Sequence, residues 1–370
     1  MWKSLFRMRA TVLNSIGTLA EDDPMLRLTR RSTLAALVAL ASAAASTAAV
    51  MPGTAHAADP VKLEIGYIPI LAASPLFIVD GQGWAKDAGI ALKLTRFESG
   101  PHAIQAMAAG QIDLLYAGVA PVLVARTKGV DISVIANSAV EEMVVAARGP
   151  FAKAVGASPT AESFKKFAAD TGRKAKIGTQ PPGSVPDTVL KHWLFKVVKV
   201  DPADVELVPM GIEKTQQALL AGALDAATIR EPTVTVTQQM DPNVALLATG
   251  AQMFPDQPGT VVAARAEVLK RNPDAIKALV KAHIRAVDLI AKDPAGSAKI
   301  VNNYLGKGLM EPATLEAAFK GPGSKFVADP HKVVPAVEQM MAYTKEIGSA
   351  SETVPVAEAF DFSFYDAAIK

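Results

Sequence analysis

The sequence of 370 residues contains no cysteine. This absence excludes a disulfide framework, a thiolate metal site, an iron–sulfur cluster and a cysteine nucleophile. Aromatic residues are also scarce, at 6%, whereas 50% of the residues are hydrophobic and 20% are charged. A chain of this length and composition buries enough apolar surface for two packed cores, which excludes intrinsic disorder.

Neither sign of charge is in large excess. The formal net charge is +2, from 38 basic and 36 acidic residues. Six of the basic residues but only three of the acidic ones precede residue 58, so the rest of the chain has a net charge of about −1. A nearly neutral chain attracts polyanions weakly, which argues against a nucleic-acid partner.

Motifs of catalysis and nucleotide binding are missing as well. The sequence has no P-loop, no HExxH and no nucleophile elbow. The histidines after residue 58 are scattered over different segments: His102, His192, His283 and His331. The string GQGWAK at residues 81–86 begins like a dinucleotide fingerprint but lacks its third small residue and follows a helical pattern. We therefore expect no enzyme, no metal site and no cofactor.

An alanine-rich apolar run, Leu34–Val50, follows the pair Arg30-Arg31 and precedes the small-residue sequence Ala55–Ala57. This order predicts an export signal at residues 1–57. The arginine pair resembles a twin-arginine signal, with ordinary secretion as the alternative, and Met25 is a second candidate start. A membrane anchor is disfavoured because 17 residues rich in alanine are few for a hydrocarbon layer of ~30 Å. We expect a periplasmic protein without direct membrane insertion.

Short apolar runs alternate with helical patterns from Val61 onwards. Strands are predicted at Leu63–Ile68, Ala91–Phe97, Ile112–Tyr116, Ile132–Ala136, Met143–Ala147, Lys176–Gly178, Val205–Pro209, Ala226–Ile229, Ala245–Thr249 and Thr260–Arg265. The helical segments between them start with serine or proline and end in glycine. The alternation predicts an α/β fold with parallel sheets and crossover helices.

One motif occurs twice. Gln105–Asp113 (QAMAAGQID) reappears as Gln217–Asp225 (QALLAGALD), 112 residues later. A repeat at this domain-sized distance predicts two similar, doubly wound lobes, although helix–glycine–strand junctions are common enough for coincidence to be the alternative. We expect the two aspartates of the repeat to cap strand starts rather than to take part in chemistry.

The repeat divides the chain into lobes. Residues 58–147 form the first part of lobe 1, residues 148–252 form lobe 2, and residues 253–370 return to lobe 1 with the C-terminal helices. The chain would then cross between the lobes near Arg148–Phe151 and Gln252–Pro258. A two-strand hinge of this kind makes a cleft that closes on a ligand.

Three segments resemble a known family: Gly66–Trp84 (GYIPILAASPLFIVDGQGW), Leu92–Ala136 and Gly222–Val234 (GALDAATIREPTV). They are similar to the solute-binding proteins of ABC importers for nitrate, sulfonate and taurine. The resemblance implies a type II periplasmic-binding fold and a small-molecule ligand, with a membrane permease and its ATPase as partners. We expect a monomer. Relatives also bind aromatic acids, pyrimidines or flavins, so the ligand stays open, and the fold includes pyrimidine synthases, whose cysteine-rich signature this sequence lacks.

Ligands of open parallel sheets bind beyond the carboxyl ends of the strands, where helix N-termini present free N–H groups to anions. The binding residues expected on the loops of lobe 1 are Ile70, Leu71, Ser74, Ser99, Gly100, Pro101, Tyr116, Gly118, Val119 and Asn137. Those expected on lobe 2 are Gln180, Gly183, Ser184, Arg230 and Glu231. For each loop alone the alternative is an ordinary helix cap.

Arg230 is the single cation at a predicted strand end, where the family commonly has an aromatic residue. Its guanidinium could hold a sulfonate or carboxylate with two N–H groups. The alternative is an ion pair with Glu231 or another carboxylate of the wall. The sequence thus predicts a periplasmic protein that captures a small organic anion for an importer, with a sensor that docks on a membrane receptor as the alternative role.

Overall fold

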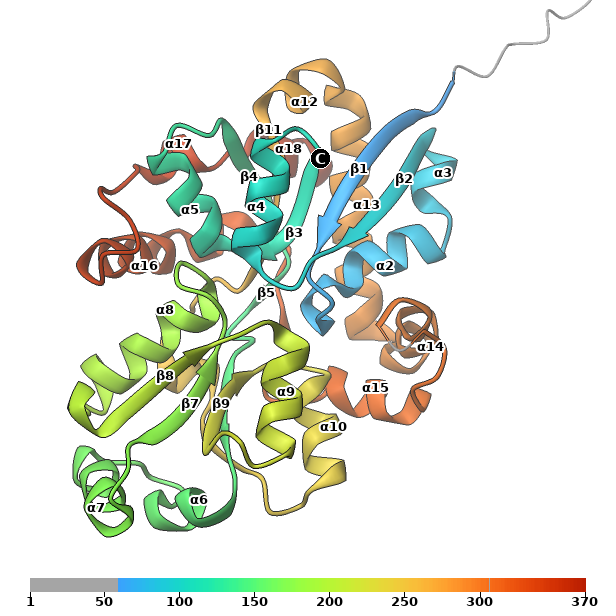
Figure 1. Cartoon of the computed structure of the whole chain (residues 1–370). Helices are drawn as coiled ribbons and strands as arrows, with labels where there is room; N and C mark the ends of the chain where they lie inside the picture. Colours follow the sequence, from blue (N-terminus) through green and yellow to red (C-terminus); the bar gives the residue numbers. More distant parts are fainter. Residues whose placement is uncertain (1–58, 306) are drawn as a thin grey trace, which may run out of the picture. The chain divides into compact units, whose positions relative to one another are not determined.

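Two five-stranded sheets organise the residues that the computed structural model describes, 59–305 and 307–370 (Figure 1). The predicted export signal at residues 1–57 and the second candidate start at Met25 lie outside the described residues. Every predicted strand is present, with ends that agree within about two residues. The apolar runs form strands because their alternate side chains enter the core, where Leu63 and Ile65 are at most 1% exposed.

The first sheet has the order β2-β1-β3-β11-β4. Its strands are β1 (Val61–Tyr67), β2 (Ile90–Arg96), β3 (Leu114–Gly118), β4 (Ile132–Asn137) and β11 (Thr260–Arg265). Strand β1 pairs in parallel with β2 and β3, whereas β11 is antiparallel to both β3 and β4. The helices that connect the strands are α2 (Ser74–Gly81), α3 (Trp84–Asp87), α4 (Gly100–Ala108) and α5 (Val119–Thr127).

The second sheet has the order β10-β6-β9-β7-β8. Its strands are β6 (Val144–Ala147), β7 (Ala175–Thr179), β8 (Val205–Pro209), β9 (Ala226–Ile229) and β10 (Ala245–Ala248). The helices of this part are α6 (Gly149–Val155), α7 (Ala161–Thr171), α8 (Val185–His192), α9 (Ile212–Leu220), α10 (Thr233–Met240) and α11 (Gly250–Met253). Strand β7 pairs in parallel with β8 and β9, and β6 is antiparallel to β9 and β10.

Both sheets are mixed, so the prediction of parallel sheets is wrong for one strand in each. One strand in each sheet, β11 and β6, lies inside the sheet and runs against its neighbours. Both follow a connection from the other sheet, and a strand that arrives without a crossover helix need not follow the common direction. Strand β6 also belongs to the second sheet, so the chain leaves the first sheet before Val144 and not near Arg148–Phe151.

Three chain segments meet between the sheets, rather than the two expected. Strand β5 (Ala139–Val140) pairs with β12 (Lys325–Phe326), and Val140 also forms an isolated bridge to Pro258. The third segment belongs to the C-terminal part. The expected two-strand hinge thus has a third strand, β12. It lies more than 180 residues after β5 in the sequence, and no local pattern predicts it.

The C-terminal part is helical, as expected. Its helices are α12 (Ala266–Arg271), α13 (Pro273–Lys292), α14 (Pro294–Leu305), α15 (Pro312–Phe319), α16 (Val334–Glu346), α17 (Val356–Ala359) and α18 (Ser363–Ala368). Helix α13 packs on α2, but α15 also packs on α10, and α16 contacts both α5 and α8. The C-terminal part is thus not confined to the first sheet. None of the helices in residues 59–305 and 307–370 is long and apolar enough to cross a membrane.

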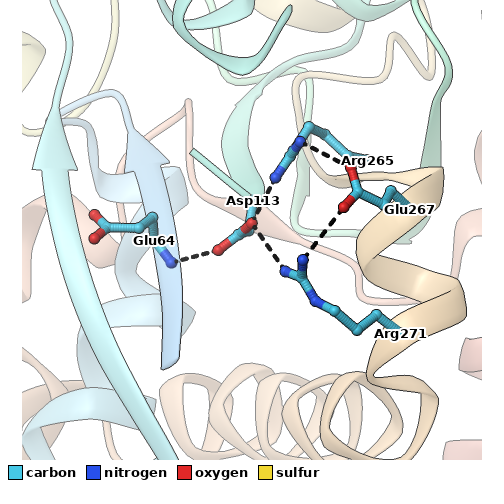
Figure 2. A network of polar contacts seen from close by, with 5 residues as sticks. All are labelled: Glu64, Asp113, Arg265, Glu267 and Arg271. Carbon is cyan, nitrogen blue, oxygen red and sulfur yellow. Dashed lines mark hydrogen bonds and ion pairs between the residues drawn. The ribbon is translucent and has the colours of Figure 1, made fainter. Parts of the chain in front are cut away.

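The duplicated aspartates cap strands, as predicted. Asp113 accepts the backbone N–H of Glu64 at 2.9 Å, and Asp225 accepts that of Lys176 at 2.8 Å. Figure 2 shows that Asp113 also lies between the guanidinium groups of Arg265 and Arg271. Each carboxylate links the strand that it precedes, β3 or β9, to the parallel neighbour of that strand, β1 or β7. The repeated motif thus makes the same contact between aspartate and backbone in both sheets.

Candidate ligand-binding site

A small pocket lies where loops of the two sheets meet. Its volume is about 10 Å³, room for roughly one water molecule. The residues that line it are Ile68, Gly100, Gly118, Pro121, Gln180, Ser184, Val185, Pro186 and Arg230. Five of them were expected in the site, namely Gly100, Gly118, Gln180, Ser184 and Arg230. The pocket is therefore at the carboxyl ends of the strands, and the ligand site predicted there stays a prediction.

Two helices begin at this pocket. Ser99 caps α4 by accepting the His102 N–H at 3.5 Å, and Ser184 caps α8 by accepting the Asp187 N–H at 3.4 Å. Neither the Gly100 N–H nor the Val185 N–H donates to another group of the described chain. Both residues line the pocket, so these N–H groups are available to an anion, with the positive ends of two helix dipoles behind them.

Other N–H groups that were expected to hold an anion are already used. The Val119 N–H donates to the Gly259 carbonyl oxygen at 3.1 Å, and the Ser184 N–H donates to that of Pro181 at 3.1 Å. The Gly183 N–H points at the Asp187 carboxylate. The expectation of donors at Val119, Gly183 and Ser184 is therefore wrong, because a long-range contact uses the Val119 N–H and local contacts use the other two.

The glycines of the pocket are required by close packing. A Cβ at Gly100 would lie 2.5 Å from Pro121 Cγ, and one at Gly118 would lie 2.6 Å from Val185 Cγ2. The second contact joins the end of β3 in the first sheet to the start of α8 in the second. Pro121 and Val185 fill the space that we expected a ligand to use, which explains the small volume of the pocket.

Arg230, at the end of β9, is paired with a carboxylate. Its Nη1 donates to Glu142 Oε1 at 3.0 Å, and the two side chains are 5% and 1% exposed. The other donors of the guanidinium have no partner among the described residues, and Arg230 lines the pocket. Burial lowers the pKa of Arg230, an effect that Glu142 opposes. The ion pair expected as the alternative exists, but it leaves part of the guanidinium free.

Glu231 does not line the pocket. Its Oε2 accepts the Thr235 N–H at 3.1 Å, near the start of α10, and its Oε1 is buried without a partner. Burial raises the pKa of this carboxyl to about 7. The Glu231 carbonyl oxygen accepts the Leu71 N–H at 2.9 Å, which links the two sheets. The residue is a buried structural acid rather than a wall of the pocket.

Tyr116 and Asn137 belong to the core. The Tyr116 hydroxyl lies 3.2 Å from His283 Nδ1, and His283 Nε2 lies 2.8 Å from the Asn137 carbonyl oxygen. A carbonyl only accepts, so Nε2 carries the proton and the Tyr116 hydroxyl donates to Nδ1. Burial lowers the pKa of His283 to about 4, which keeps the ring neutral. Both residues were expected in the site, and this chain of hydrogen bonds holds them elsewhere.

The remaining expected residues do not line the pocket. Ile70, Leu71 and Ser74 are buried beside β1, and Ser74 Oγ has no partner. Pro101 fills the second position of α4. The lining residues that the sequence analysis missed are Ile68, Pro121, Val185 and Pro186. The last two directly follow the Ser184 cap, so the Ser-x-Pro helix start was the signal for them.

A second, larger cavity is lined in part by residues that are near neighbours, in the sequence, of residues in the small pocket. Its volume is about 140 Å³, and the residues that line it are Pro69, Arg96, Ile212, Glu213, Gln216, Pro232, Thr233, Val236, Leu305 and Met310. Six of these residues are apolar. The charge of Arg96 is offset by Glu98, at 2.9 Å, and by Glu213. Ile68 and Arg230 face the small pocket, while their near neighbours Pro69 and Pro232 face this cavity.

Comparisons with known proteins indicate the family and the fold of this chain. The model of the NMT1-like family matches residues 56–304. A candidate binding protein of Brucella abortus strain 2308 is 26% identical over 252 residues, which cover 67% of this chain and 73% of that protein. In the residues described here, no group of three or more acidic or histidine side chains could hold a metal ion.

Two solved structures have the same fold. The alkanesulfonate-binding protein SsuA of Xanthomonas axonopodis pv. citri, bound to MOPS, has a TM-score of 0.67 and 20% identity over 83% of this chain and 100% of that one. The periplasmic nitrate-binding protein NrtA of Synechocystis PCC 6803 has a TM-score of 0.67 and 16% identity, over 84% and 88% of the two chains. The predicted periplasmic-binding fold is therefore confirmed.

Proposed function

This chain belongs to the NMT1-like family, and we propose that it is the periplasmic substrate-binding component of an ABC importer, which captures a small organic anion. One observation carries the proposal. Gly100 and Val185, whose N–H groups have no partner among the described residues and which start helices over different sheets, line the same pocket as Arg230. An anion between them would interact with both sheets at once, and a ligand of this kind favours the closed form.

The larger cavity supports an organic ligand over nitrate. Its apolar side chains, such as Ile212 and Val236, offer nothing to a small inorganic ion. The pocket at Arg230 would receive the charged group, and the cavity beyond Pro69 and Pro232 would receive the carbon chain. The present pocket volume of about 10 Å³ is too small for a sulfonate group, so Val185 has to move away from Gly118 as the ligand enters.

The ligand would be delivered to a membrane permease and its ATPase, without chemical change. The relatives named above are binding proteins, and the pocket offers backbone N–H groups and one paired cation rather than an acid, a base and a nucleophile. We also propose that the protein is exported and that it is a monomer.

Isothermal titration calorimetry tests the function. The protein is titrated with butanesulfonate, ethanesulfonate, taurine and nitrate, and with uncharged cytosine as a control. We expect one site per chain, with butanesulfonate bound more tightly than ethanesulfonate because more apolar surface is buried, by about 0.8 kcal/mol for each added CH₂. Binding of cytosine but of no anion would contradict the proposal and favour a pyrimidine-binding protein.

A further inference from the structure

The carboxylate that pairs with Arg230 is held from both sides. Glu142 Oε1 accepts the Arg230 Nη1–H at 3.0 Å, and Glu142 Oε2 accepts the Thr260 hydroxyl at 2.8 Å. All three residues are buried, with Glu142 1% and Thr260 0% exposed. A Cβ at Gly259 would lie 2.7 Å from Glu142 Cγ, so this glycine leaves the side chain its place. The position of the carboxylate is therefore fixed.

Glu142 cancels the only full charge of the pocket. Among the nine residues that line it, Arg230 alone has a charged side chain. The nearby Asp187 has a partner of its own, Lys191, at 2.9 Å. What remains is the partial positive charge at the starts of α4 and α8, roughly half an elementary charge for each helix. Together they balance one negative charge.

We infer that Glu142 sets the charge selectivity of the site: by neutralising Arg230, it makes the pocket accept ligands with one negative charge and reject dianions. The inference rests on the proposed function, and it narrows the ligand to monoanions such as sulfonates. A second negative charge on the ligand would lose its water without gaining a cation, and the carboxylate of Glu142, 3.0 Å from Arg230 Nη1, would repel it. Arg230 still donates hydrogen bonds to the ligand, but Glu142 already balances its positive charge.

Methanesulfonate and sulfate test this inference, because they have the same tetrahedral oxyanion shape and differ by one charge. Calorimetry should show that the wild-type protein binds methanesulfonate about tenfold or more tightly than sulfate. In Glu142→Gln, which keeps the shape and an oxygen acceptor for Arg230, sulfate affinity should rise by about tenfold or more relative to methanesulfonate. An unchanged ratio in Glu142→Gln, or a wild-type preference for sulfate, would overturn the inference.

Two further variants separate charge from position. Thr260→Val keeps the charge of Glu142 but removes its second hydrogen bond, so both affinities should fall by similar factors and the ratio should stay. The double variant Arg230→Gln, Glu142→Gln removes both charges, and the preference for methanesulfonate should persist at lower affinity. This variant keeps the test decisive even if Glu142→Gln alone does not fold, because a lost preference would overturn the inference.

The same titrations distinguish the inference from the proposed function. If the wild-type protein binds methanesulfonate and sulfate equally well, anion capture stands and the role of Glu142 is wrong. If it binds neither these two nor the longer sulfonates, the proposed function fails and the inference fails with it.

Discussion

Replacing Arg230 with alanine should lower the free energy of unfolding by about 3–5 kcal/mol, the usual cost of removing one partner of a buried ion pair. The buried carboxylate of Glu142 would then keep its charge, with the Thr260 hydroxyl as its remaining hydrogen-bond donor among the described residues. Urea unfolding followed by circular dichroism measures the change. Most of the loss comes from the stranded carboxylate, so Glu142→Ala in the same chain should restore part of the stability.

An exposed ion pair is the control for this experiment. Lys166 and Asp170 lie four residues apart on α7, at 2.8 Å, with side chains that are 70% and 58% exposed. Lys166→Ala should change the free energy of unfolding by less than about 0.5 kcal/mol, because water already solvates both charges. If Arg230→Ala costs no more than Lys166→Ala, the buried pair does not stabilise the fold as described.

Arg230→Ala should also weaken binding of the anion, by about 1.5–3 kcal/mol, the scale of a charge-assisted hydrogen bond. Arg230→Lys should recover little where two N–H groups of the guanidinium are needed. These values apply to folded protein, so the titration is made well below the midpoint of thermal unfolding of each variant. Unchanged affinity in Arg230→Ala would restrict the residue to a structural role.

Glu231→Gln should stabilise the protein at pH 8 by up to about 3 kcal/mol, with little effect near pH 4.5. The pKa of Glu231 is raised to about 7 in the fold, from an ordinary value of 4.5. The contribution of such an acid to the stability of the folded state is fully present when the pH is below the pKa of the acid in the unfolded chain. It is lost as the pH rises from about 4.5 to 7. Glutamine stays neutral throughout and keeps an oxygen for the Thr235 N–H.

The pH dependence has to be read as a difference between variant and wild type. His283 acts in the opposite direction, since its pKa is lowered from 6.5 to about 4 and its stabilisation is lost as the pH falls through that range. The two effects overlap and partly cancel in the wild-type protein. Unfolding free energies of wild type and Glu231→Gln, measured from pH 4.5 to 8, remove the contribution of His283. A constant difference across this range would contradict the raised pKa of Glu231.

Much of the fold followed from local patterns. Strands such as β7 and β9 were found because short apolar runs end at Gly178 and at the Glu231-Pro232 step. Strands β5 and β12 were missed because each has two residues and is defined only by its partner. Strand β6 was placed in the wrong lobe because sequence order, unlike pairing, does not show where a chain crosses between sheets.

The site followed from the sequence in outline only. Small residues at the starts of predicted helices led to Ser184 and Gly100, and the lone cation at a strand end led to Arg230. All three line the pocket. The partner of Arg230 could not be predicted, because Glu142 lies 88 residues earlier in the chain. The same limit applies to Tyr116, whose hydroxyl is used by a histidine 167 residues away. Which polar groups remain free depends on such distant contacts.

A crystal structure with 2-bromoethanesulfonate tests the central claim most directly, because anomalous scattering locates the bromine. We predict that the sulfonate oxygens accept the N–H groups of Gly100 and Val185 and contact the guanidinium of Arg230. The bromine should lie toward the cavity beyond Pro69 and Pro232. A sulfonate bound elsewhere, or bound without contact to either helix start, would contradict the account.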